Sequence, residues 1–103
     1  MSDDNVEIAN ALGAAMNAEL VIELQKLKAS FDTWESGERK PVELCSDLEA
    51  FVRTRLQELH TIYRVADPVY ALAYAVRRGV LRQEDIPEGV KSSVNDIIGA
   101  VKM

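Results

Sequence analysis

The sequence predicts an all-α fold, a small four-helix bundle-like domain with a long N-terminal helix. Apolar residues recur every three or four positions through almost the whole chain, which is the period of an α-helix. Pro41 and Pro68 stand where first helical turns are expected. Between the first two apolar stretches, residues 32–40 are polar and contain Gly37, which is typical of a loop between antiparallel helices.

The first helix, expected at 4–31, carries two apolar faces. Asp4 is its expected N-cap, and Glu7 completes a capping box. One face has the spacing of a core helix and is rich in leucine; it consists of Ala9, Leu12, Met16, Leu20, Leu24, Leu27 and Phe31. The nearly opposite face is a heptad-spaced seam of small residues and isoleucine, made of Ile8, Ala11, Ala15, Ala18 and Ile22.

Two apolar faces on one helix leave three arrangements open. The helix could be buried at the centre of a single-chain bundle. Alternatively, the leucine-rich face packs on its own chain and the seam packs on a second copy. The third arrangement places a different protein on the seam. We expect the homodimer, because a chain of 103 residues has little left to cover both faces.

Three further helices are expected, at 41–64, 68–78 and 88–101. The second has a broad apolar stripe in which Cys45 is read as a small core residue. Asp67 is a strong N-cap candidate for the third helix, and Gly79 is its expected C-terminal stop. The connector at 80–87 has room for a single helical turn. The last helix has a narrow apolar stripe and is weakened by glycine.

Composition indicates one globular domain over residues 1–103, with 48% hydrophobic residues and a net charge of −5. The first half, residues 1–50, holds four basic and eleven acidic residues. An acidic surface of this kind argues against nucleic acid as the main partner, since phosphate contact needs basic side chains. The longest apolar run, Val69 to Val76, is far shorter than the roughly 20 residues of a membrane span. A single cysteine and no export signal favour the cytoplasm.

Few residues offer catalytic or metal chemistry. His60 is the only histidine and falls on a polar helix face, so we expect it in solvent. Glu19 and Glu23 are four residues apart and could form an acid–base pair or bind a cation. We favour the interpretation that they are polar edges of a helix interface, with Lys26 pairing with Glu23. No catalytic residue, metal site or cofactor is therefore expected, and the chain is not predicted to be an enzyme.

A partner-binding site is predicted on the third helix, where Tyr70, Tyr74 and Arg77 form one strip. Tyr, Arg and Trp are the residue types most enriched at binding hot spots, so Trp34 is a further candidate. The alternative is that the tyrosines flank the core and that Trp34 covers one end of the bundle.

The leading functional hypothesis is a non-catalytic protein–protein interaction or regulatory module that dimerises through its first helix and binds a further, unidentified protein. The runner-up is a protein that holds a small apolar ligand between its helices. A third hypothesis is a DNA-binding regulator in which the third and fourth helices loosely suggest a helix-turn-helix. The connector is longer than the usual turn of that motif.

Overall fold

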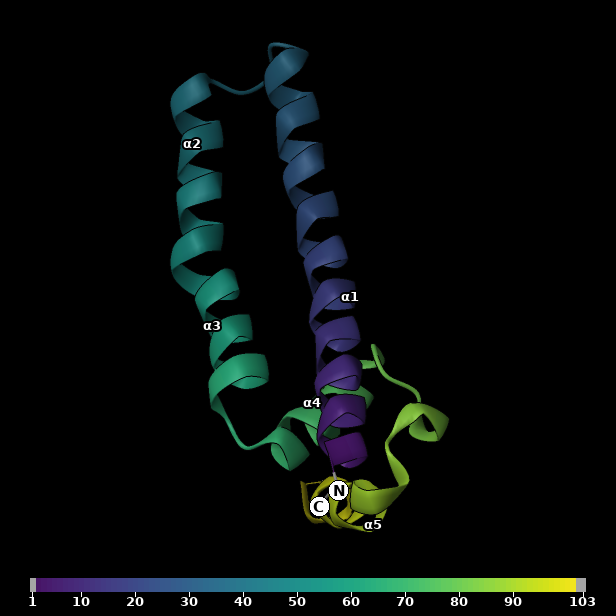
Figure 1. Ribbon diagram of the computed structural model, residues 1–103. Coiled ribbons are helices and arrows are strands. Elements are labelled where there is room, and N and C mark those ends of the chain that lie inside the picture. Colours follow the sequence, from purple (N-terminus) through teal and green to yellow (C-terminus); the bar gives the residue numbers. More distant parts are fainter. Residues whose placement is uncertain (1, 102–103) are drawn as a thin grey trace.

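The fold is all-α: four helices, of which the long N-terminal helix packs against the others (Figure 1). The computed structural model describes the backbone of residues 2–101 and the side chains of residues 5–100, and no strand occurs in this part of the chain. The helices are α1 (Ser2–Glu35), a continuous helix at 41–65, α4 (Pro68–Arg78) and α5 (Lys91–Val101). All four predicted helices are thus confirmed.

The long helix α1 extends further at both ends than predicted. It begins at Ser2, so Asp4 lies within the helix and is not its N-cap; the Asp4 side chain is outside the described residues. At the other end the helix continues to Glu35, so the expected loop begins about four residues late. Gly37 then takes a φ of 87°, a left-handed conformation that favours glycine, and the chain turns back.

The helix at 41–65 alternates between α-helical and π-helical winding. It starts as α2 (Pro41–Ala50) and ends its α-helical part with the short α3 (Gln57–His60). Two π-helical stretches, Phe51–Leu56 and Thr61–Val65, follow α2 and α3 respectively. In the first stretch the Thr54 hydroxyl donates to the Ala50 carbonyl at 2.6 Å, in competition with the backbone bond to that carbonyl. Each π-helical turn rotates the residues after it relative to a regular α-helix.

Helix α4 has the predicted ends. The Asp67 side chain accepts hydrogen bonds from the amides of Val69 and Tyr70 at 2.8 and 3.4 Å, which caps the N-terminus. Gly79 ends the helix with a φ of 78°. Residues 80–90 then connect to α5 through two short 3₁₀ turns. Gln83–Asp85 is the single turn predicted in the connector at 80–87, and Glu88–Val90 stands where the last helix was predicted to begin.

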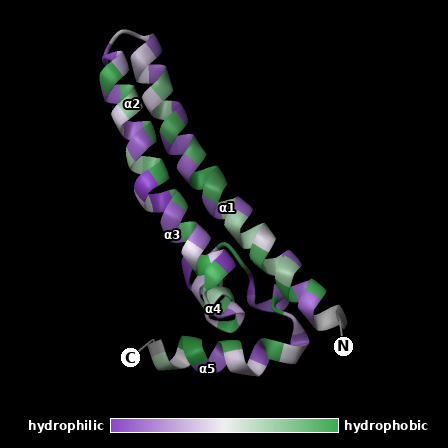
Figure 2. Ribbon diagram, turned by 60° about the vertical axis from the view of Figure 1, so that its left-hand side comes forward, coloured by the Kyte–Doolittle hydropathy of each residue, from purple (hydrophilic) through white to green (hydrophobic). Residues whose placement is uncertain are grey.

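The core lies at one end of the molecule, around α4. Four neighbouring residues of this helix are almost completely buried: Ala71, Leu72, Ala73 and Ala75. The N-terminal half of α1, the end of the 41–65 helix, the connector and α5 surround it. Beyond the core, α1 and α2 continue as an antiparallel hairpin that stands clear of the other helices (Figures 1 and 2).

The predicted assignment of the two α1 faces was wrong in part. Ala15, placed on the seam, has 0% of its surface exposed and lies in the core of the single chain, and Ile8 and Ala11 pack against that core. On the other face, Leu24 is 54% exposed. The reason is geometric: the stripe that α1 turns toward its own chain runs between the two predicted faces and passes through Glu19 and Glu23.

Candidate interaction site

Glu19 is the centre of a buried charge network that joins α1 to two other helices. Its side chain has no exposed surface. Arg78, the last residue of α4, donates to Oε1 from Nε and Nη2 at 3.0 and 2.7 Å. Arg55 donates to the same oxygen at 3.3 Å, and the Tyr63 hydroxyl donates to Oε2 at 3.1 Å. Three of these donors converge on Oε1 and one reaches Oε2, so both oxygens of the buried carboxylate are hydrogen-bonded.

Arg55 extends the network to a second buried carboxylate. Its Nε donates to Glu23 Oε2 at 3.2 Å, and its Nη1 forms an ion pair with Glu58. Lys26 also reaches Glu23, at 3.4 Å, so the predicted Lys26–Glu23 pair is confirmed. Arg55 lies in the first π-helical stretch, which means that an irregular part of the 41–65 helix positions the cation that links both glutamates.

The network shifts the pKa of its members in directions that follow from these contacts. Burial alone would lower the pKa of Arg55, but hydrogen bonding with Tyr74 and Glu23 outweighs it and the pKa is raised. The hydrogen bond to Glu19 raises the pKa of Arg78. Burial, followed by the negative charge of Glu19, raises the pKa of the Tyr63 hydroxyl. Both arginines stay charged, and Tyr63 stays a neutral donor.

Chemically, this cluster is suited to holding helices together. Both carboxylates form ion pairs with arginines from other helices. Glu19 and Glu23 therefore lie at a helix interface, as the favoured interpretation expected, but they are more deeply buried than the edge of an interface. Sequence reasoning missed Arg55, Arg78 and Tyr63 as their partners. These residues are 32 to 59 positions away from the glutamates, and no local pattern connects them.

An apolar surface runs along one side of the α1–α2 hairpin. All of its residues except Leu27 follow an inward-facing position by one residue, as Leu20 follows Glu19 and Val52 follows Phe51. One residue is a 100° rotation, and in an antiparallel pair these flanks point to the same side. We call this surface the hairpin face; it consists of Leu20, Leu24, Leu27, Phe31, Trp34, Cys45, Leu48, Val52 and Leu56.

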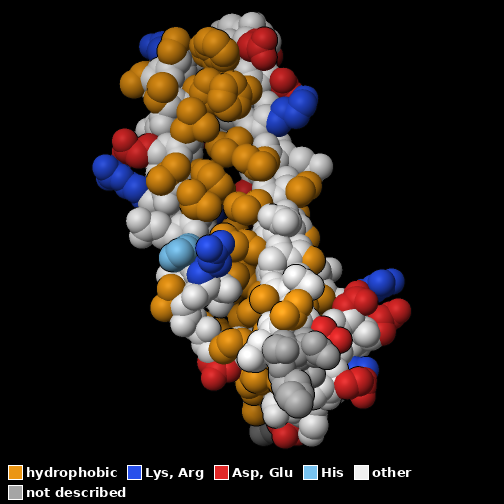
Figure 3. Space-filling model, viewed as in Figure 1, with side chains coloured by type: hydrophobic (Ala, Val, Ile, Leu, Met, Phe, Trp, Pro, Cys, Tyr) orange, Lys and Arg blue, Asp and Glu red, His pale blue; other side chains and the backbone are white. Residues whose placement is uncertain are grey.

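Five of the nine residues of the hairpin face are exposed, and the other four, Leu20, Leu27, Leu48 and Leu56, are half-buried. Leu24 and Val52 are 54% and 50% exposed, and Phe31 and Trp34 are each 38% exposed. The two rings pack edge to face, with centroids 6.4 Å apart. Figure 3 shows hydrophobic side chains gathered in a band over both helices of the hairpin, with charged groups at its edges. Cys45, predicted in the core, is exposed instead, because a two-helix hairpin has no third layer to cover it.

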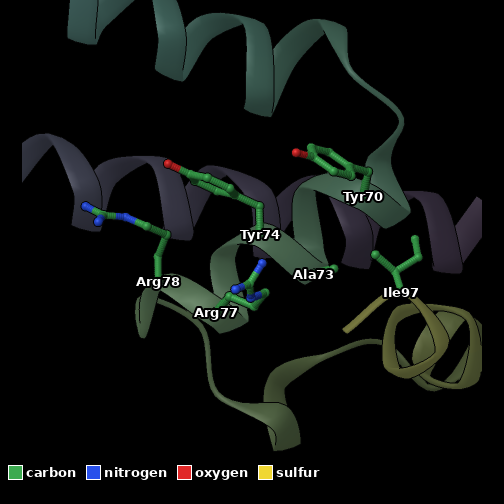
Figure 4. A pocket seen from close by; sticks show the side chains of 6 residues that line it. All are labelled: Tyr70, Ala73, Tyr74, Arg77, Arg78 and Ile97. Carbon is green, nitrogen blue, oxygen red and sulfur yellow. The ribbon is translucent and has the colours of Figure 1, made fainter. Parts of the chain in front are cut away.

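The predicted partner strip forms the wall of a pocket on α4. Tyr70, Tyr74 and Arg77 line a cavity of about 280 Å³ together with Ala73, Arg78 and Ile97 of α5. Figure 4 shows the rings of Tyr70 and Tyr74 along one edge, with Arg77 below them and Ile97 at one end. Tyr74 also packs edge to face on Tyr63, at 6.0 Å.

The structure separates the other predicted site residues. Trp34 lies in the last turn of α1, at the tip of the hairpin, and not beside the α4 strip. Of the five seam residues, Ala15 has no exposed surface, Ile8 and Ala11 pack on the core, and only Ala18 and Ile22 lie outside that core. His60 is exposed, as predicted.

Comparisons with known proteins identified no similar protein. No protein-family model, curated protein or solved structure matches the chain. None of the described helices is long and apolar enough to cross a membrane. Among the same residues, no group of three or more His, Cys, Asp or Glu side chains is arranged to hold a metal ion.

Proposed function

We propose that this protein is a non-catalytic interaction module that self-associates by pairing the hairpin faces of two copies. The observation that carries the proposal is the hairpin face itself, a continuous apolar surface that no other part of the described chain covers. As in the sequence prediction, α1 contributes to the dimer. Its contribution comes through Leu24, Phe31 and Trp34, on the side opposite Ile22.

The single chain exposes more surface than a compact monomer of its mass. The chain exposes 6880 Å², whereas folded monomers of 11.4 kDa expose about 5,800 Å². Its radius of gyration is 16.8 Å, against about 13 Å for a compact domain of this length. The excess of about 1,100 Å² exceeds the roughly 800 Å² that each partner buries in a standard interface.

The geometry of the hairpin favours a second copy as that partner. Each helix of a two-helix hairpin can bury only the stripe that meets the other helix, so the adjacent stripe needs a further layer. Two identical hairpins packed face to face supply that layer for each other and form a four-helix bundle. The same residues would then meet across a two-fold axis, which is the usual arrangement of homodimers.

A matched pair of variants tests the proposal by sedimentation equilibrium. Leu24→Glu places a charge in the centre of the hairpin face, and burying it unpaired costs several kcal/mol. Val21→Glu makes the same kind of change three residues earlier, at a side chain that is 52% exposed and lies about 200° around α1 from the inward-facing Glu19. We expect the wild type and Val21→Glu to sediment as dimers and Leu24→Glu as a monomer with unchanged helicity.

Ile22→Glu distinguishes this face from the seam, because Ile22 is the most exposed large residue of the seam on the back of the hairpin. If our proposal is correct, the Ile22→Glu variant remains a dimer. A monomeric Ile22→Glu together with a dimeric Leu24→Glu would move the interface to the seam. A wild type that stays monomeric at high concentration would end the proposal altogether.

A further inference from the structure

The pocket on α4 holds an arginine whose charge the fold does not use. Its two basic neighbours are engaged: Arg78 is bound to Glu19 at 2.7 Å and Arg82 to Asp85 at 3.0 Å. Within the described part of the chain, no carboxylate forms an ion pair with Arg77, which lines the pocket. Arg77 is therefore the guanidinium at this corner that is left for an anion from outside the chain.

The remaining walls of the pocket suit a flat apolar group. The rings of Tyr70 and Tyr74 form one edge, and Ala73 and Ile97 supply aliphatic surface (Figure 4). Ala73 is itself almost completely buried and contributes only a small side chain to the lining. Tyr70 is 48% exposed, so its ring is accessible to a ligand. Rings stack well on tyrosine in offset or edge-to-face arrangements.

The volume limits what can enter. A cavity of roughly 150 Å³ accommodates one benzene molecule, and drug-sized ligands occupy pockets of about 300–1,000 Å³. At about 280 Å³, this pocket has room for one aromatic ring and a small charged substituent. Guanidinium groups bind carboxylates through two parallel hydrogen bonds.

We propose that the α4 pocket binds an aromatic carboxylate, with the ring against Tyr70 and Tyr74 and the carboxylate on Arg77. The same chemistry is presented by a free aromatic acid and by the C-terminal aromatic residue of a peptide. The site is at the end of the molecule opposite the hairpin tip, so it does not depend on self-association.

Titrations followed by ¹H–¹⁵N NMR test the site with defined probes. Phenylacetate represents the free acid, and Gly-Gly-Phe with a free C-terminus represents the peptide. Phenylacetamide and the amidated peptide are their neutral counterparts. We expect at least one acid to shift the amides of Ala73 and Ile97 in a saturable manner, and its neutral counterpart to bind at least about tenfold more weakly, as loss of a charge-assisted contact predicts.

Arg77→Gln provides the decisive comparison, with Arg64→Gln as its matched control. Arg64 is an exposed arginine outside the pocket, so both variants lose one surface charge and both are expected to fold, which circular dichroism checks. Arg77→Gln should weaken the acid at least about tenfold and Arg64→Gln should not. Binding of phenylacetate would indicate a free aromatic acid as the ligand, and binding of Gly-Gly-Phe would indicate the C-terminus of a peptide. The proposal is overturned if neither acid binds, if the neutral counterpart binds equally well, or if Arg77→Gln binds like wild type.

Discussion

At Glu19 a carboxylate without exposed surface is held by side chains from two other helices. Taking a charge out of water is costly, and the cost is offset only where the partners are close and well oriented. Here Arg55 and Arg78 are both partly exposed, so their charges stay in contact with solvent while the glutamate does not. The stability of the junction between hairpin and core therefore depends on keeping both cations in place.

Replacing Arg55 tests this dependence. Arg55→Met keeps an unbranched, largely aliphatic side chain but removes the guanidinium, which leaves Glu19 and Glu23 short of a shared cation. We expect it to lower the free energy of unfolding by about 3 kcal/mol, the loss typical of breaking a buried pair. Arg53→Met, two residues earlier, removes a solvent-exposed pair with Glu49 and should cost less than about 1 kcal/mol. Urea denaturation measures both; equal small losses would show that the network contributes little.

Tyr63 gives the network a pH dependence at alkaline pH. Burial and the charge of Glu19 raise the pKa of its hydroxyl in the folded state. A raised folded-state pKa contributes stability that is complete below the unfolded value, about pH 10 for tyrosine, and is lost as the pH rises above it. Urea denaturation at pH 8 and pH 11 should therefore show a smaller alkaline loss in Tyr63→Phe than in wild type. An identical loss in both proteins would contradict this assignment.

At the scale of elements, the helices were predictable and their contacts were not. Apolar period, Pro41, Pro68 and the Asp67 cap are local signals, and they located all four helices to within a few residues. Which stripe of α1 faces its own chain depends on partners distant in sequence, such as Arg78. Two glutamates in an apolar setting were the one local sign of a buried charged stripe, but no spacing identified the arginines that stabilise it.

The Asp67 cap carries the element-scale prediction. Its carboxylate accepts from two amides at the start of α4, the helix around which the core is built. Asp67→Ala should therefore destabilise the whole fold by about 1 kcal/mol. Asp96→Ala, at an exposed position on α5, serves as control and should change stability by less than about 0.5 kcal/mol. Thermal unfolding followed by circular dichroism compares them; equal melting temperatures would rule out the cap as a significant contribution.

The whole molecule has two differently built ends. One end is a compact core around α4, which carries the small pocket with Arg77. The other is a hairpin only two helices thick, whose hairpin face stays exposed in the single chain (Figure 3). The 53 Å length of the molecule follows from α1, whose 34 residues at 1.5 Å each span about the same distance. Such a division suits a protein that joins a copy of itself at one end and leaves the other free.

Cys45 allows the central claim to be tested at the surface concerned. It is the only cysteine of the chain, it is exposed in the single copy, and it belongs to the hairpin face. The rate of its alkylation by a maleimide can be measured at concentrations where sedimentation gives either one or two copies. The account predicts that alkylation slows at least about tenfold in the dimer and stays fast in Leu24→Glu at every concentration. A dimer whose Cys45 reacts as fast as that of Leu24→Glu would show that the two copies meet elsewhere.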